Sequence, residues 1–155
     1  MIMDLVLWRH AQAQDWTPGC DDMARRLTTR GEKQAARMAS WLDRQLPEGS
    51  PILASPAIRT EQTAMALGRK FKLCPALSPE TSVSELLVLL GWPNVKGTTL
   101  LIGHQPQLGQ LASEFMGWPT TDCAIKKGAV WWLRKRDREG GSQTMVVTVQ
   151  SPDFL

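Results

Sequence analysis

Short apolar runs alternate along the chain with longer segments in which apolar residues recur every three or four positions. The apolar runs at 5–8, 51–54 and 98–102 predict three strands, because each is short and ends at turn or helix-initiating residues. Helical spacing predicts four helices, at about 29–46, 56–68, 83–90 and between Gly103 and Gly117. Strands that alternate with helices in this way indicate an α/β fold built around a sheet.

The first two predicted helices carry N-terminal signals. Thr29 followed by Glu32 matches a capping box, which places the first N-cap at Thr29. In the second helix we expect Ser55 as the N-cap and Pro56 at the first helical position, where its missing N–H is tolerated. The apolar stripe of the first helix consists of Ala35, Ala36, Met38, Ala39, Leu42 and Leu46.

The C-terminal part of the chain is predicted to add a helix and a hairpin. Segments 129–133 and 145–149 predict two strands joined around the turn at Gly140-Gly141. We interpret the basic stretch 134–138 first as a solvated turn and second as a docking patch. The preceding helix is expected to end at Gly117 and to bury Leu108, Leu111, Ala112 and Phe115.

Composition narrows the class of protein. A chain of 155 residues with 43% hydrophobic and 21% charged residues predicts one globular domain over 1–155. A net charge of +3 is too small to predict a nucleic acid or a membrane as partner, and it is compatible with an anionic ligand. Three cysteines without paired spacing, and no basic apolar leader at the N-terminus, favour a soluble protein of the reducing cytoplasm.

Four residues with suitable chemistry follow the predicted strands directly. Arg9-His10 ends the first strand, Arg59 follows the second, and Gly103-His104 ends the third. If these strands are parallel, as the intervening helices imply, their carboxyl ends meet at one edge, where ligands bind in open α/β sheets. The pattern therefore gathers two arginines and two histidines around one crevice.

This set of side chains is sufficient for phosphoryl transfer. A neutral imidazole is a competent nucleophile near pH 7, and planar guanidinium groups match the oxygens of a phosphoryl group. Taken alone, each histidine is better explained as a structural hydrogen-bonding residue, and each arginine as a surface charge. Their joint placement favours an anion site, and leaves open whether that site is catalytic.

Four stretches resemble motifs of the histidine phosphatase superfamily in order and spacing. They are 7–11 around Arg9-His10, 26–31, 55–64 around Arg59, and 101–106 around His104. The resemblance extends from about residue 5 to 112, and the compact length is similar to that of the SixA-type phosphohistidine phosphatases. It implies a three-layer α/β/α sandwich with a mostly parallel central sheet, similar to phosphoglycerate mutase.

The resemblance also implies roles for these residues. His10 would be transiently phosphorylated, Arg9 and Arg59 would clamp the phosphoryl oxygens, and His104 would bind the same group. Arg26 is a further candidate for the anion pocket, and a simple loop charge explains it equally well. The resemblance implies no metal and no cofactor. The implied substrate is a phosphohistidine protein; the alternatives are a small phosphate ester, or a phosphorylated ligand bound without turnover.

The chain departs from the family pattern in two respects. Ala11 replaces the family glycine after the histidine; a methyl group there can narrow the pocket or shift the loop, and we expect activity to survive. No general acid is evident: Glu80 and Glu85 are candidates, and we interpret both first as surface charges. A Cys-x5-Arg pattern that begins at Cys20 suggests a cysteine-based phosphatase, which we reject because the adjacent aspartates would repel phosphate.

Overall fold

The computed structural model describes residues 1–91, 96–120 and 123–155, and its strands form one sheet. The order across the sheet is β3-β2-β4-β1-β5-β6. β1 pairs in parallel with β4, and β2 pairs in parallel with both β4 and β3, whereas β5 is antiparallel to β1 and to β6. The prediction of a mostly parallel sheet is therefore confirmed. The strands are β1 Ile2–Arg9, β2 Ile52–Ala54, β3 Lys72–Leu73, β4 Gly97–Gly103, β5 Val130–Arg138 and β6 Gly141–Gln150.

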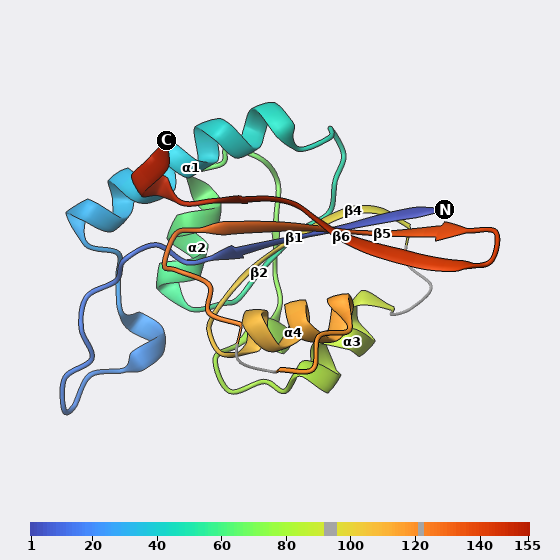
Figure 1. Cartoon of the computed structure of the whole chain (residues 1–155). Coiled ribbons are helices and arrows are strands. Elements are labelled where there is room, and N and C mark those ends of the chain that lie inside the picture. The colour runs from blue at the N-terminus through green and yellow to red at the C-terminus, as the bar shows by residue number, and fades with distance from the viewer. Residues whose placement is uncertain (92–95, 121–122) are drawn as a thin grey trace.

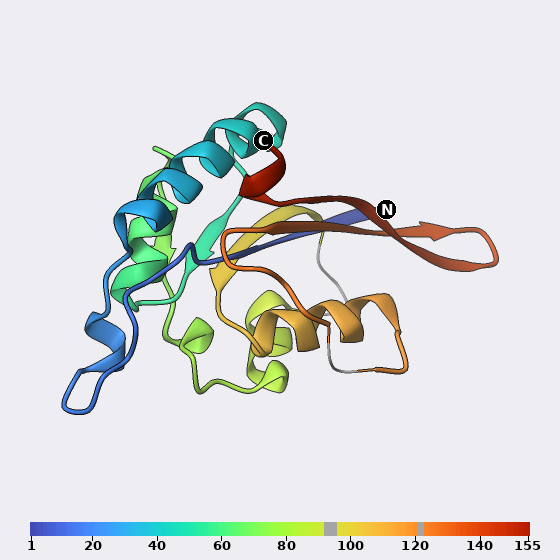
Figure 2. The ribbon, with the colours of Figure 1, turned by 60° about the vertical axis from the view of Figure 1, so that its left-hand side comes forward.

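Helices cover both faces of this sheet. Figures 1 and 2 show α1 and α2 on one face and α3 and α4 on the other. The three-layer α/β/α arrangement is thus confirmed. The α-helices are α1 Thr29–Gln45, α2 Ile58–Met65, α3 Val83–Leu90 and α4 Gln107–Met116, and the 3-10 helices are η1 Asp22–Ala24, η2 Pro75–Leu77 and η3 Pro152–Phe154.

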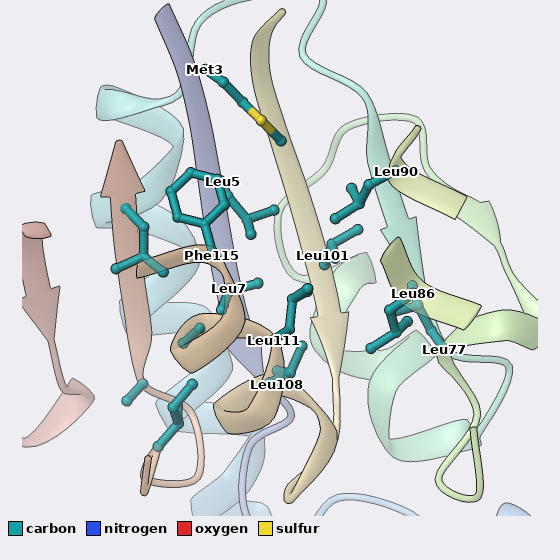
Figure 3. Close-up of a cluster of buried hydrophobic side chains, with 14 residues drawn as sticks. Met3, Leu5, Leu7, Leu77, Leu86, Leu90, Leu101, Leu108, Leu111 and Phe115 are labelled. Carbon is teal, nitrogen blue, oxygen red and sulfur yellow. The ribbon is translucent and has the colours of Figure 1, made fainter. Parts of the chain in front are cut away.

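The alternation of side chains along β1 explains the two helical layers. Leu5 and Leu7 point into the core beneath α3 and α4 (Figure 3), whereas Val6 and Trp8 point into the core beneath α1 and α2. All four side chains are fully buried. A central strand buries both of its faces, so apolar residues occupy consecutive positions along it.

Two predicted N-caps are wrong by a few residues. The N-cap of α1 is Thr28 and not Thr29, because the Thr28 hydroxyl accepts from the N–H of Gly31. α2 begins at Ile58, and Ser55 instead accepts the N–H of Ala57 in the turn before the helix. Of the predicted stripe on α1, Ala36 is exposed.

The sequence interpretation was also wrong about two strand segments. The basic stretch 134–138 is the second half of β5, paired with β6 in a long hairpin that projects from the body of the molecule (Figure 1). β3 was missed because it has only two residues, both exposed, and thus no apolar pattern. No helix in the part of the chain that the structure describes is long and apolar enough to span a bilayer.

Candidate active site

The parallel pairing of β1 with β4 brings the two histidines together. Arg9 and Gly103 are register partners at the ends of these strands, and the N–H of His10 donates to the Gly103 carbonyl at 3.1 Å. The ring centroids of His10 and His104 are 5.3 Å apart. β2 ends at the same edge, since the N–H of Ser55 donates to the carbonyl of Ile102 in β4. Sheet register therefore places the exits of three strands side by side.

The tautomer of His10 follows from its hydrogen bond. Its Nδ1 lies 2.7 Å from the carbonyl oxygen of Ala11, and the residue is 6% exposed. A carbonyl oxygen only accepts hydrogen bonds, so Nδ1 carries the proton and donates it. Nε2 consequently holds the free lone pair, as a nucleophilic imidazole requires.

Burial keeps both histidines neutral. The pKa of His10 is lowered to about 3, chiefly by desolvation, with the charges of Arg59, Arg9 and Lys127 acting in the same direction. The hydrogen bond to the Ala11 carbonyl opposes this shift in part. The pKa of His104 is likewise lowered to about 3, chiefly by desolvation and in part by His10 and Arg59. At neutral pH both imidazoles are therefore uncharged, and they stay so well below the ordinary histidine pKa of 6.5.

His104 is held between a hydroxyl and a guanidinium. Its Nε2 lies 2.8 Å from the Oγ of Ser55, and its Nδ1 lies 3.4 Å from Nη2 of Arg59. A guanidinium only donates, so Nδ1 is the acceptor and Nε2–H donates to Ser55. His104 is only 4% exposed. Its ring orientation is set by Ser55 and Arg59, which both belong to the segment that follows β2.

Arg59 lies in the first turn of α2 and is 3% exposed. Its Nη1 donates to the backbone carbonyl of Asp22 at 2.7 Å, and its Nη2 pairs with Oδ2 of the same residue at 3.0 Å. Arg9 is positioned differently, with Nη1 donating to the carbonyl of Ile125 at 2.9 Å. Both Nε atoms are buried, and neither has a hydrogen-bond partner among the residues that the structure describes.

These unpartnered groups define the chemistry of the site. A buried N–H without an acceptor is unfavourable, and these two donors belong to cations whose charges act on His10, so the arrangement is chemically able to bind an oxyanion. Lys127, whose charge acts on His10, adds to the positive potential. Within residues 1–91, 96–120 and 123–155 no group of three histidines, cysteines or acids is arranged to hold a metal ion.

Ala11 fits its position without strain. Its N–H donates to the hydroxyl of Thr63 at 3.2 Å, and that hydroxyl donates to the carbonyl of Arg59. Among the described residues only glycines have a positive φ, so the backbone of Ala11 does not need the freedom of glycine. The side chain is fully buried. The departure from the family glycine is therefore sterically accommodated.

The remaining predicted residues lie outside this group. Arg26 is exposed, and no contact between it and the two histidines or Arg59 is found in the described part of the chain. Glu85 lies in the first turn of α3, where its backbone N–H donates to the hydroxyl of the N-cap Ser82 and its carboxylate accepts from that hydroxyl. Glu80 is exposed.

Sequence reasoning missed three contributors: Asp22, Ser55 as the partner of His104, and Lys127. Ser55 was part of a recognised stretch, 55–64, and its position after a strand was a usable signal. Asp22 lies in a long loop whose composition contains no signal of its contact with Arg59, 37 positions away. Lys127 follows no strand and belongs to none of the four stretches.

Comparison with known proteins agrees with this geometry. The profile of the histidine phosphatase superfamily (branch 1) matches residues 5–82. The chain is 32% identical over 140 residues to an uncharacterised protein of Picosynechococcus, covering 85% of each chain. It is 32% identical over 120 residues to the phosphohistidine phosphatase SixA of Escherichia coli, covering 72% of this chain and 73% of the relative.

Among solved structures, the protein histidine phosphatase SixA complexed with tungstate matches with a TM-score of 0.75 and 27% identity. The match covers 97% of this chain and 98% of that chain, which confirms the predicted fold over nearly the whole length. Family profile, relatives and structure agree with the order of motifs in the sequence, and the chain belongs to the histidine phosphatase superfamily.

Proposed function

We propose that this protein is a phosphohistidine phosphatase that moves the phosphoryl group of a phosphorylated protein onto Nε2 of His10 and then to water. The observation that carries this proposal is the hydrogen bond from Nδ1 of His10 to the Ala11 carbonyl, 2.7 Å long. It leaves the lone pair on Nε2, and burial keeps that nitrogen unprotonated at neutral pH.

The reaction has two balanced steps. In the first, Nε2 of His10 attacks phosphorus, the phosphorus–nitrogen bond of the substrate breaks, and the departing imidazole takes a proton from solvent. In the second, water attacks the phosphoryl group on His10, the bond to Nε2 breaks, and a proton passes from the water to solvent. Inorganic phosphate leaves, and His10 regains its lone pair. One difficult displacement is thus divided into two easier ones.

Arg9, Arg59 and His104 stabilise the charge that moves through these steps. The two free Nε–H groups are the donors assigned to the phosphoryl oxygens. His104 presents Nδ1 beside Arg59, with Nε2 held by Ser55. A phosphoryl dianion raises the pKa of a neighbouring imidazole, so Nδ1 of His104 becomes protonated when the group binds. Nδ1–H then no longer accepts from Arg59 and instead donates a hydrogen bond to a phosphoryl oxygen.

Two further observations support a phosphoramidate as the substrate. Asp22 is the one carboxylate with a described contact to Arg9, His10, Arg59 or His104, and Glu85 is engaged at the start of α3. A leaving imidazole needs less help from an acid than an alkoxide does. The similar proteins named SixA include one described as a phosphohistidine phosphatase and one solved with tungstate, a tetrahedral oxyanion like phosphate.

The three cysteines are free, which supports a reducing compartment, and we place the activity in the cytoplasm. We propose that neither metal nor cofactor takes part. Assays that contain a chelator test this directly, because a metal-dependent enzyme would lose activity in them.

The experiment compares a phosphohistidine-bearing protein with a panel of phosphate esters for the wild type, His10→Ala and Arg59→Ala. Arg44→Ala, an exposed arginine late in α1, is the control for loss of an arginine. We expect phosphoramidate hydrolysis by the wild type and the control, a strongly reduced but measurable rate for Arg59→Ala, and none for His10→Ala, with phosphate found on His10 by mass spectrometry after an alkaline quench. Faster turnover of esters would move the substrate class to small phosphates. Phosphate binding without any turnover would overturn the enzyme assignment.

A further inference from the structure

We propose that Asp22 is the positioning residue for Arg59, holding its guanidinium so that the free donors face the phosphoryl group. This inference rests on the proposed function, because it concerns the same anion site. Asp22 belongs to η1, a short 3-10 helix in the loop between β1 and α1. No motif in the sequence marks it.

Arg59 donates two hydrogen bonds to Asp22, one from each terminal nitrogen of the guanidinium. Nη1 of Arg59 donates to the backbone carbonyl of Asp22 at 2.7 Å, and Nη2 donates to its carboxylate at 3.0 Å. Two acceptors on one residue fix the plane of the guanidinium as well as its position. The carboxylate also supplies a counter-charge to a cation that is 3% exposed.

Asp22 is itself held from the other side. Its Oδ1 accepts from Nε of Arg25 at 2.9 Å and lies 2.8 Å from Nη2 of that residue. Nη1 of Arg25 donates to the carbonyl of Gln14 at 2.7 Å. Asp21 caps η1 by accepting the N–H of Met23. The loop thus forms a continuous chain of polar contacts from Gln14 through Arg25 and Asp22 to Arg59.

The guanidinium of Arg59 has enough N–H donors to bind Asp22 and a phosphoryl group at the same time. A guanidinium has five N–H donors. The carbonyl and carboxylate of Asp22 take one each, and Nδ1 of His104 faces a further one on Nη2. Nε–H and one N–H of Nη1 remain, and Nε has no partner in the described residues. Asp22 therefore orients Arg59 without consuming the donors that a phosphoryl group needs.

The test measures kcat, KM and tungstate affinity for Asp22→Ala and Asp22→Asn, alone and in an Arg59→Ala background. Asp43→Asn is the matched control, because Asp43 forms a similar ion pair with Arg69 near the far end of α1. Asp22→Ala is expected to lower kcat/KM and tungstate affinity by about 10- to 100-fold, the usual effect of losing a hydrogen bond to a charged group. Asp22→Asn keeps one side-chain acceptor and should recover part of the loss. In the Arg59→Ala background the effect of Asp22→Ala should vanish.

Three results would overturn the inference. Tighter tungstate binding by Asp22→Ala would show that the carboxylate competes with the anion. An equal loss with and without Arg59 would show that Asp22 acts only by supporting the loop. Unchanged kinetics in both Asp22 variants would show that Asp22 does not position Arg59. Thermal denaturation of each variant verifies folding. If Asp22→Ala does not fold, the kinetics and tungstate affinity of Asp22→Asn test the inference. A wild type that neither binds tungstate nor hydrolyses substrate would instead remove the proposed function and this inference with it.

Discussion

The hydroxyl of Ser55 lies 2.8 Å from Nε2 of His104, so a residue that follows β2 orients the imidazole that follows β4. The contact is fully buried, since Ser55 is 0% exposed. It determines which nitrogen of His104 faces Arg59. Ser55 therefore affects the phosphoryl site without belonging to it, and this suggests a direct test.

Ser55→Ala is expected to reduce kcat by about 10-fold, the usual effect of losing one buried hydrogen bond, with a smaller change in KM. The variant should also lose about 1 kcal/mol of stability, because the N–H of Ala57 loses its acceptor. Steady-state kinetics and urea denaturation measure the two effects. Ser50→Ala, which removes a hydroxyl bonded to Pro47 outside the site, is the control. An unchanged kcat would show that His104 keeps its orientation without Ser55.

Ala11→Gly is expected to leave kcat/KM unchanged and to lower stability by about 1–2 kcal/mol. The backbone at Ala11 has no positive φ, so glycine adds freedom to the unfolded chain, and it also removes a buried methyl group. Kinetics on a phosphoramidate substrate, together with thermal denaturation, test this expectation. A clear rise in turnover would mean that the buried methyl group obstructs the pocket.

The free energy of unfolding should fall as the pH decreases from about 6.5 to about 4. Folding lowers the pKa of His10 and His104 from 6.5 to about 3, mainly through burial. The unfolded chain therefore binds about one more proton than the folded one near pH 6.5 and almost two more near pH 4–5, so stability rises with pH. Urea denaturation at several pH values, in buffers without phosphate, gives the slope. His10→Asn should halve the slope; the same slope in that variant would show that His10 is protonated in the folded protein.

Gly109→Ala is expected to destabilise the protein by about 1–3 kcal/mol or to prevent folding. A Cβ at this position of α4 would overlap the backbone carbonyl of Cys123, which cannot move aside as a flexible side chain does. Gly103→Ala is the comparison, because its Cβ would lie 3.4 Å from a Leu108 side-chain carbon in ordinary contact. Thermal denaturation of both variants is the measurement. Equal stability would mean that the segment near Cys123 yields readily.

The local pattern of apolar residues was sufficient to locate the carboxyl ends of the strands, and hence to predict much of the site. Arg9, His10, Arg59 and His104 could be grouped from sequence because apolar runs locate strands and parallel strands share one edge. The motifs around them pointed to the family that the comparisons then confirmed. The helix that starts at Thr29 was one residue off at its cap, since neighbouring threonines carry the same signal.

Tertiary structure alone decided how those residues are held. The pairing of Asp22 with Arg59 and of Ser55 with His104 joins segments 37 and 49 positions apart, and no local periodicity encodes such contacts. The tautomer and lowered pKa of His10 depend on a carbonyl oxygen and on burial, which exist only once the chain has folded. The basic half of β5 became a strand because β6 pairs with it, against its polar composition. Sequence thus determined which groups meet, and packing determined their protonation, orientation and partners.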